Sequence, residues 1–154
     1  MCCRFTATMI GWYKALLRGR MPQTILIVED NPVEQKIVSM LASRCGYAVE
    51  VAATGFKALD MLSEKADYAA VLMNYMLPAM NGFECTQHIR GLNNRARQVP
   101  IIAVTAFTLD DARQQCLQAG MDDYLSKPYT VEQFESMLNR WVGDDVAAAS
   151  SLRH

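Results

Sequence analysis

Several polar residues in the sequence carry groups that suit the binding of a divalent cation and of phosphoryl oxygens. Glu29 and Asp30 follow a short apolar run, and Asn74, Thr105 and Lys127 each follow another short strand-like run. Paired carboxylates suit a hard cation such as Mg²⁺, which takes oxygen ligands and usually keeps several waters. A hydroxyl and an ammonium group suit a phosphoryl group, because lysine acts on its oxygens as a point charge. If the fold brings these residues together, they form a site for phosphoryl chemistry.

The elements that would position these residues are short strands alternating with helices. The predicted strands are residues 24–28, 47–52, 69–73, 101–105 and 123–126. The segments between and after them have helical spacing of apolar residues. This alternation predicts an α/β fold, a single doubly wound five-stranded parallel sheet flanked by five helices. Because the carboxyl ends of parallel strands share one edge of the sheet, the polar residues that follow them can converge there.

Side chains that can cap helices mark the predicted helix starts. The capping pairs are Asn31 with Glu34, Asn81 with Glu84, Thr108 with Asp111, and Thr130 with Gln133, and Thr54 can cap a further helix. Residues 33, 37 and 41 recur four apart on the first helix, and residues 131, 134, 138 and 141 predict one apolar face on the last. The helices are therefore expected to pack on the sheet through these faces.

Composition fits one globular domain and excludes several classes of function. The chain has 154 residues, of which 51% are hydrophobic, and a net charge of −1, which gives no indication of nucleic-acid binding. Its five cysteines are scattered without metal-ligand spacing, which is typical of free thiols in a reducing cytosol. No glycine-rich dinucleotide motif or nucleotide phosphate loop occurs. We expect a cytoplasmic protein that contacts neither nucleic acid nor membrane.

Both ends of the chain are predicted to lie outside the domain, which spans residues 22–142. Residues 1–21 carry four basic side chains and no acid, and we predict an extension that is disordered or a short helix. A basic amphipathic helix lying on a membrane or a partner is the alternative. Residues 143–154 are predicted to be a frayed C-terminal tail.

Four motifs together resemble the response-regulator receiver domain of two-component phosphorelays, over about residues 23–142. The motifs are Ile-Val-Glu29-Asp30-Asn-Pro, Met-Asn74-Tyr-Met-Leu-Pro78-Ala-Met-Asn-Gly82, Ala-Val-Thr105-Ala and Gly120-Met-Asp-Asp-Tyr124-Leu-Ser-Lys127-Pro128. They are especially similar to receivers attached to hybrid sensor kinases. The resemblance implies the flavodoxin-like receiver fold and a signalling module that is not itself an enzyme.

The resemblance also implies a role for each residue of the site. It assigns Mg²⁺ to Glu29, Asp30, Asn74 and the backbone carbonyl of Met76, the phosphoryl group to Thr105 and Lys127, and an activation switch to Thr105 and Tyr124. It implies a cis peptide bond before Pro128. It implies a histidine kinase or a histidine phosphotransfer domain as partner, and the faces of the last two helices could form a homodimer.

Asn74 departs from the family, because receivers carry their phosphoacceptor aspartate four residues before this proline. A neutral carboxamide oxygen is a far weaker nucleophile than a carboxylate, so ordinary aspartyl phosphorylation should be blocked. The amide oxygen of Asn74 can still ligate a cation, but the site has lost one negative charge and should bind Mg²⁺ more weakly. No residue beside Asn74 offers an obvious substitute acceptor.

More than one interpretation of Asn74 remains open. Either the domain acts independently of phosphorylation, or asparagine has replaced an aspartate and holds the unphosphorylated state; the retained Asp30, Thr105 and Lys127 favour the second. A pure interaction or dimerisation module is an alternative function. A Mg²⁺-dependent phosphatase-like enzyme is less favoured, since the segment around Asn74 supplies no aspartate nucleophile.

Overall fold

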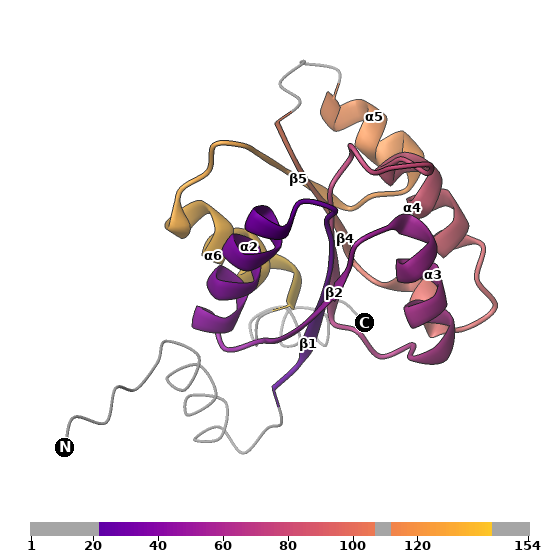
Figure 1. Cartoon of the computed structure of the whole chain (residues 1–154), viewed down its shortest axis with the longest axis horizontal. Coiled ribbons are helices and arrows are strands. Elements are labelled where there is room, and N and C mark those ends of the chain that lie inside the picture. Colours follow the sequence, from indigo (N-terminus) through magenta and orange to yellow (C-terminus); the bar gives the residue numbers. More distant parts are fainter. Residues whose placement is uncertain (1–21, 107–111, 143–154) are drawn as a thin grey trace, which may run out of the picture.

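A five-stranded parallel sheet with helices on both faces forms the domain in our computed structural model, which describes residues 22–106 and 112–142 (Figure 1). The strands are β1 (Thr24–Val28), β2 (Ala48–Ala52), β3 (Ala70–Met73), β4 (Ile101–Thr105) and β5 (Asp123–Ser126). Their order across the sheet is β2-β1-β3-β4-β5, with every neighbouring pair parallel. The predicted doubly wound sheet is confirmed. Its strand order reverses between β1 and β3, which is where open α/β sheets place their ligand crevice.

Helices cover the two faces of the sheet unequally. The α-helices in the described residues are α2 (Pro32–Arg44), α3 (Gly55–Glu64), α4 (Gly82–Arg90), α5 (Ala112–Ala119) and α6 (Val131–Val142). Helices α2 and α6 lie on one face, and α3, α4 and α5 lie on the other (Figure 1). In the polar segment after α4, residues 95–98 form a short 3-10 helix, η1 (Arg95–Gln98).

Alternating side chains of each central strand divide the core into two layers. Leu26 and Val28 of β1 pack with the layer under α3 and α4, whereas Ile25 and Ile27 pack with the layer under α2 and α6. Successive residues of a strand point to opposite faces. A strand covered on both faces must therefore be apolar throughout, which explains the continuous run in the sequence of β1.

Capping side chains begin the helices largely where the sequence predicts. Asn81 accepts hydrogen bonds from the N–H groups of Phe83 and Glu84, both at 3.0 Å, and Glu84 accepts the N–H of Asn81 at 3.0 Å. Thr130 and Gln133 exchange the same pair of bonds, at 2.9 and 3.1 Å. The Thr54 hydroxyl accepts the N–H of Lys57 at 3.1 Å. These caps are confirmed, and they fix where α4, α6 and α3 leave the carboxyl edge of the sheet.

The predicted apolar face of α2 is wrong in part. Val33 and Ile37 are 65% and 39% exposed, and the buried residues are Val38, Leu41 and Ala42. Four residues exceed one helical turn of 3.6, so a row spaced by four drifts around the helix away from the core. On α6, Phe134 and Leu138 are fully buried as predicted, whereas Val131 in the first turn is 41% exposed.

A clamp centred on Arg90 joins the last turn of α4 to the amino ends of β4 and β5. The guanidinium donates to the carbonyls of Gly120, Arg97 and Val99 at 2.9, 2.8 and 2.7 Å. It also donates to the Asp122 carboxylate at 2.8 Å, and that carboxylate accepts the N–H of Ile101 at 2.8 Å. The clamp lies at the sheet edge opposite to the polar strand ends.

Some predictions fall on residues outside the described ranges. They are the extension at 1–21, the cap formed by Thr108 and Asp111, and the tail at 143–154. Within residues 22–106 and 112–142, none of the helices has the length and apolar character needed to cross a membrane.

Burial should make the Cys85 thiol unreactive in the folded chain. Cys85 is fully buried, its Sγ lies 3.6 Å from the carbonyl oxygen of Gly55, and burial raises its pKa from 9.0 to about 12. Because the thiolate is the reactive form, we expect iodoacetamide at pH 8 to alkylate Cys85 roughly a thousandfold more slowly in the native chain than in urea. Peptide mapping by mass spectrometry measures both rates, and equal rates would contradict this burial.

Candidate metal and phosphoryl site

Backbone hydrogen bonds at the carboxyl edge of the sheet set the positions of the polar strand ends. The N–H of Glu29 donates to the carbonyl of Ala52 at 3.0 Å, and the N–H of Asn74 donates to that of Val28 at 3.0 Å. Beyond β5, the N–H of Lys127 donates to the carbonyl of Thr105 at 2.8 Å. The parallel ladder thus continues one residue past the strands and fixes where these side chains start.

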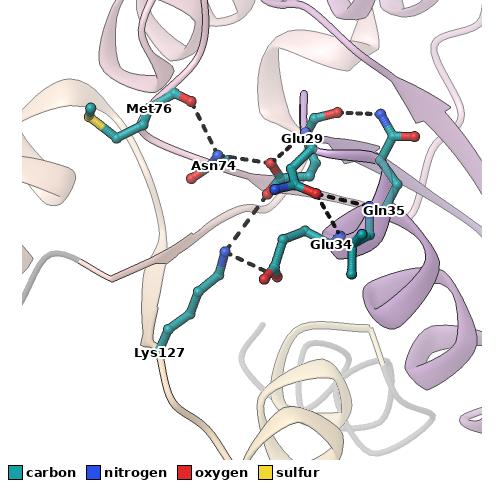
Figure 2. Close-up of polar contacts among 8 residues, drawn as sticks. Glu29, Glu34, Gln35, Asn74, Met76 and Lys127 are labelled. Carbon is teal, nitrogen blue, oxygen red and sulfur yellow. Dashed lines mark hydrogen bonds and ion pairs between the residues drawn. The ribbon is translucent and has the colours of Figure 1, made fainter.

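Glu29 is the buried centre of the site, with only 4% of its surface exposed. Its Oε1 accepts the N–H of Asn31 at 3.1 Å and the side-chain NH₂ of Asn74 at 3.1 Å, while its Oε2 lies 3.8 Å from the Lys127 ammonium (Figure 2). Burial raises the pKa of Glu29 and the adjacent Asp30 adds to this effect, whereas the Asn31 hydrogen bond and the Lys127 charge oppose it.

The carboxamide of Asn74 turns its nitrogen, not its oxygen, toward the groups expected to ligate a metal. Nδ2 donates to Glu29 and, at 3.2 Å, to the backbone carbonyl of Met76 (Figure 2). The Met76 side chain points away and is 70% exposed, although its carbonyl faces the site. Asp30, the other predicted carboxylate, is exposed at the rim. As a cation ligand, Asn74 would have to rotate its amide by half a turn.

Lys127 lies against two carboxylates, those of Glu29 and Glu34. The sequence predicted a different partner for Glu34. Its Nζ is 3.3 Å from Oε2 of Glu34 and 3.8 Å from Oε2 of Glu29 (Figure 2). Glu34 was predicted to complete a capping box with Asn31, and this is wrong. The Asn31 side chain does cap α2. However, the backbone N–H of Asn31 donates to Glu29 and not to Glu34, and the Glu34 side chain extends toward Lys127. An acid in the first turn after the Glu29-Asp30 pair was the available signal.

Thr105 lies at the end of β4 and Tyr124 lies in β5, and their roles in phosphoryl binding and switching stay predictions. Thr105 ends β4 with 4% of its surface exposed, and its carbonyl holds Lys127 in place. Tyr124 is half-buried and packs against the core layer under α3 and α4. The peptide bond between Lys127 and Pro128 is cis, as expected.

The convergent oxygens of this site fit a hard cation. Oε1 of Glu29 and the carbonyl of Met76 share one donor, the Asn74 nitrogen, so both point to the same place. Carboxylate and carbonyl oxygens are the ligands that Mg²⁺ takes in proteins. When bound, such an ion supplies positive charge to phosphoryl oxygens. Lys127, on the other side of Glu29, offers a second positive charge for the same purpose.

A family profile and many known proteins match this chain. The profile of the response regulator receiver domain matches residues 25–139. The response regulator DivK of Brucella anthropi is 33% identical over 124 residues, which cover 80% of this chain and 99% of that protein. The hybrid signal transduction protein dokA of Dictyostelium discoideum is 35% identical over 121 residues, or 79% of this chain, and the chain spans only 7% of its length.

Solved structures with the same fold include one that holds a metal. The receiver domain of the sensor histidine kinase PA1611 from Pseudomonas aeruginosa is 43% identical, with a TM-score of 0.72 over 80% of this chain and 99% of that one. A magnesium ion is coordinated in its active-site cleft. The predicted flavodoxin-like fold is confirmed by this similarity and by the sheet order.

Proposed function

The chain belongs to the response regulator receiver domain family, and we propose that it acts in a phosphorelay through protein contacts, without accepting a phosphoryl group at residue 74. The observation that carries this proposal is the amide at the centre of an otherwise complete site. Glu29 accepts from the Asn74 amide and faces the Lys127 ammonium, and the carbonyl of Thr105 accepts the N–H of Lys127. The nucleophile is the one group that differs from the family pattern.

The chemistry of the carboxamide supports a site that does not react. An ionised carboxylate can attack phosphorus, whereas the neutral oxygen of an amide is a far weaker nucleophile and would not give an ordinary acyl phosphate. Both hydrogen bonds of the Asn74 nitrogen also hold the side chain against Glu29 and Met76. We therefore propose that Thr105 and Lys127 keep the geometry of phosphoryl binding while no phosphoryl group becomes attached to Asn74.

The remaining roles follow the family pattern. We propose that Glu29, Asp30 and the Met76 carbonyl hold Mg²⁺, with an affinity weakened by Asn74, and that Thr105 and Tyr124 form the switch. The relative with 43% identity carries magnesium in its cleft, which supports the choice of ion. We propose that residues 22–142 are the working receiver, that it acts in the cytoplasm, and that α5 and α6 can form a homodimer.

The proposed partner is a histidine kinase or a histidine phosphotransfer domain, because receivers of this family take their phosphoryl group from a phosphohistidine. The relative dokA is by name a hybrid signal transduction protein. On this proposal the chain is a docking module, and it binds its partner in one conformation that does not depend on phosphorylation.

Calorimetric titration with a histidine phosphotransfer domain tests this function. We expect the affinity of the chain to be the same with and without Mg²⁺ and beryllofluoride, a phosphoryl mimic that needs a carboxylate. The Asn74→Asp variant is the matched control, and its affinity should change on adding the mimic. A change of several-fold in the chain with Asn74, or no binding to any phosphotransfer or kinase domain, would overturn the proposal. Gel filtration of the same samples reports whether the oligomeric state also changes when the mimic is added.

A further inference from the structure

The nitrogen of Asn74 lies where the expected metal ligands meet. Its two hydrogens are both used, one toward Oε1 of Glu29 at 3.1 Å and one toward the carbonyl of Met76 at 3.2 Å (Figure 2). A divalent cation would satisfy the same two oxygens with positive charge. The amide instead donates one hydrogen bond to each oxygen, so a neutral group stabilises the two oxygens in place of an ion.

The buried carboxylate of Glu29 is compensated from within the chain on both of its oxygens. Oε1 receives the N–H groups of Asn31 and Asn74, and Oε2 faces the ammonium of Lys127. Burying a charge is costly unless it is paired and hydrogen-bonded, and here it is both. The chain's own groups therefore offset part of this cost with no ion.

Rotating the amide would remove this compensation. A half turn directs the oxygen of Asn74 at the oxygens of Glu29 and Met76, and three acceptors facing each other repel unless a cation stands between them. Binding an ion thus requires breaking both hydrogen bonds first. With aspartate at this position there are no such hydrogen bonds to break, and the extra negative charge favours binding of the ion.

From this geometry we infer that Asn74 is an internal substitute for the cation, which competes with Mg²⁺ for Glu29 and Met76 instead of helping to ligate it. The inference rests on the proposed function, since it takes this site to be the receiver metal site. It adds a reason for a single state: the carboxamide holds the strand ends of β1 and β3 together as long as Mg²⁺ does not displace it.

Calorimetric titration with Mg²⁺ alone distinguishes a competitor from a ligand. Asn74→Ala removes the amide and frees both oxygens, so we expect it to bind Mg²⁺ about five- to a hundredfold more tightly than the unchanged chain, the worth of the two hydrogen bonds. Asn74→Asp should bind more tightly still. Equal or weaker binding by Asn74→Ala would show that the amide oxygen is a ligand and would overturn the inference.

Asn94→Ala is the matched control, because the Asn94 amide also donates to backbone carbonyls, those of Leu62 and Ser63, outside the site. Its affinity for Mg²⁺ should equal that of the unchanged chain. If Asn74→Ala does not fold, Asn74→Leu takes its place, because leucine is close to asparagine in size and has neither a donor nor an acceptor; it should also bind Mg²⁺ more tightly than the unchanged chain, and equal or weaker binding would overturn the inference. These titrations involve no partner, so a failure here is distinct from a failure of the docking function.

Discussion

Asn74→Asp should convert the chain from one that gains no phosphoryl group to one that is modified nearly completely by acetyl phosphate and Mg²⁺. The aspartate oxygen attacks phosphorus, acetate leaves with the electron pair of the broken bond, and an acyl phosphate remains. Lys127 and Mg²⁺ neutralise charge that develops on the phosphoryl oxygens. Intact-mass spectrometry measures the modification, which should resist acid and be lost in base.

A carboxylate placed elsewhere serves as control for this experiment. Asn94→Asp makes the same chemical change at a residue whose amide binds the carbonyls of Leu62 and Ser63, and it should remain unmodified. Equal modification of the unchanged chain and the Asn74→Asp variant would show that residue 74 does not decide the reaction. Modification of neither would show that the pocket lacks more than its nucleophile.

Gly82→Ala should be the most disruptive small change near the site, lowering the free energy of unfolding by about 1–3 kcal/mol. A Cβ at residue 82 would stand 2.6 Å from the backbone oxygen of Asn74 and 3.0 Å from the Cα of Tyr75. Neither atom belongs to a flexible side chain, so the connection from β3 to α4 must move. The movement would displace Asn74 from Glu29, and in the Asn74→Asp background it should also slow phosphorylation.

Gly91→Ala is the control for this prediction. Its Cβ would meet only the carbonyls of His88 and Gln87, at 3.5 and 3.7 Å, and its φ of −88° is ordinary for any residue. We expect its stability to stay the same or to rise by up to about 1 kcal/mol, because alanine reduces the entropy of the unfolded chain. Urea denaturation of both variants gives the comparison, and similar losses would indicate that crowding at Asn74 is not the cause.

The sheet and most helix starts were predictable because they depend on local patterns. A strand covered on both faces has no polar positions, and β1 was found from that pattern alone. Caps such as Asn81 with Glu84 are also local, since both partners lie within one turn. The buried face of α2 depends on which side of the helix meets the sheet, and a spacing of four residues did not determine it.

The orientation of side chains in the site could not be predicted from spacing. The residue types and the shared edge of the sheet were enough to place Glu29, Asn74 and Lys127 together. The orientation of the Asn74 amide depends on whether a donor or an acceptor is needed beside Glu29. That need is set by the backbone carbonyl of Met76, which accepts from the same nitrogen. Glu34 was assigned to its own helix because the nearest competing partner, Lys127, is remote in sequence.

The Arg90 clamp divides the domain into parts that should exchange their amide hydrogens with water at different rates. The N–H of Ile101 donates to a carboxylate that Arg90 also holds, and Arg90 in turn binds the connections before β4 and β5. Opening one of these connections requires releasing all of them, so they should open as one cooperative unit. We therefore expect the opposite end of the sheet to keep its structure when the carboxyl edge changes.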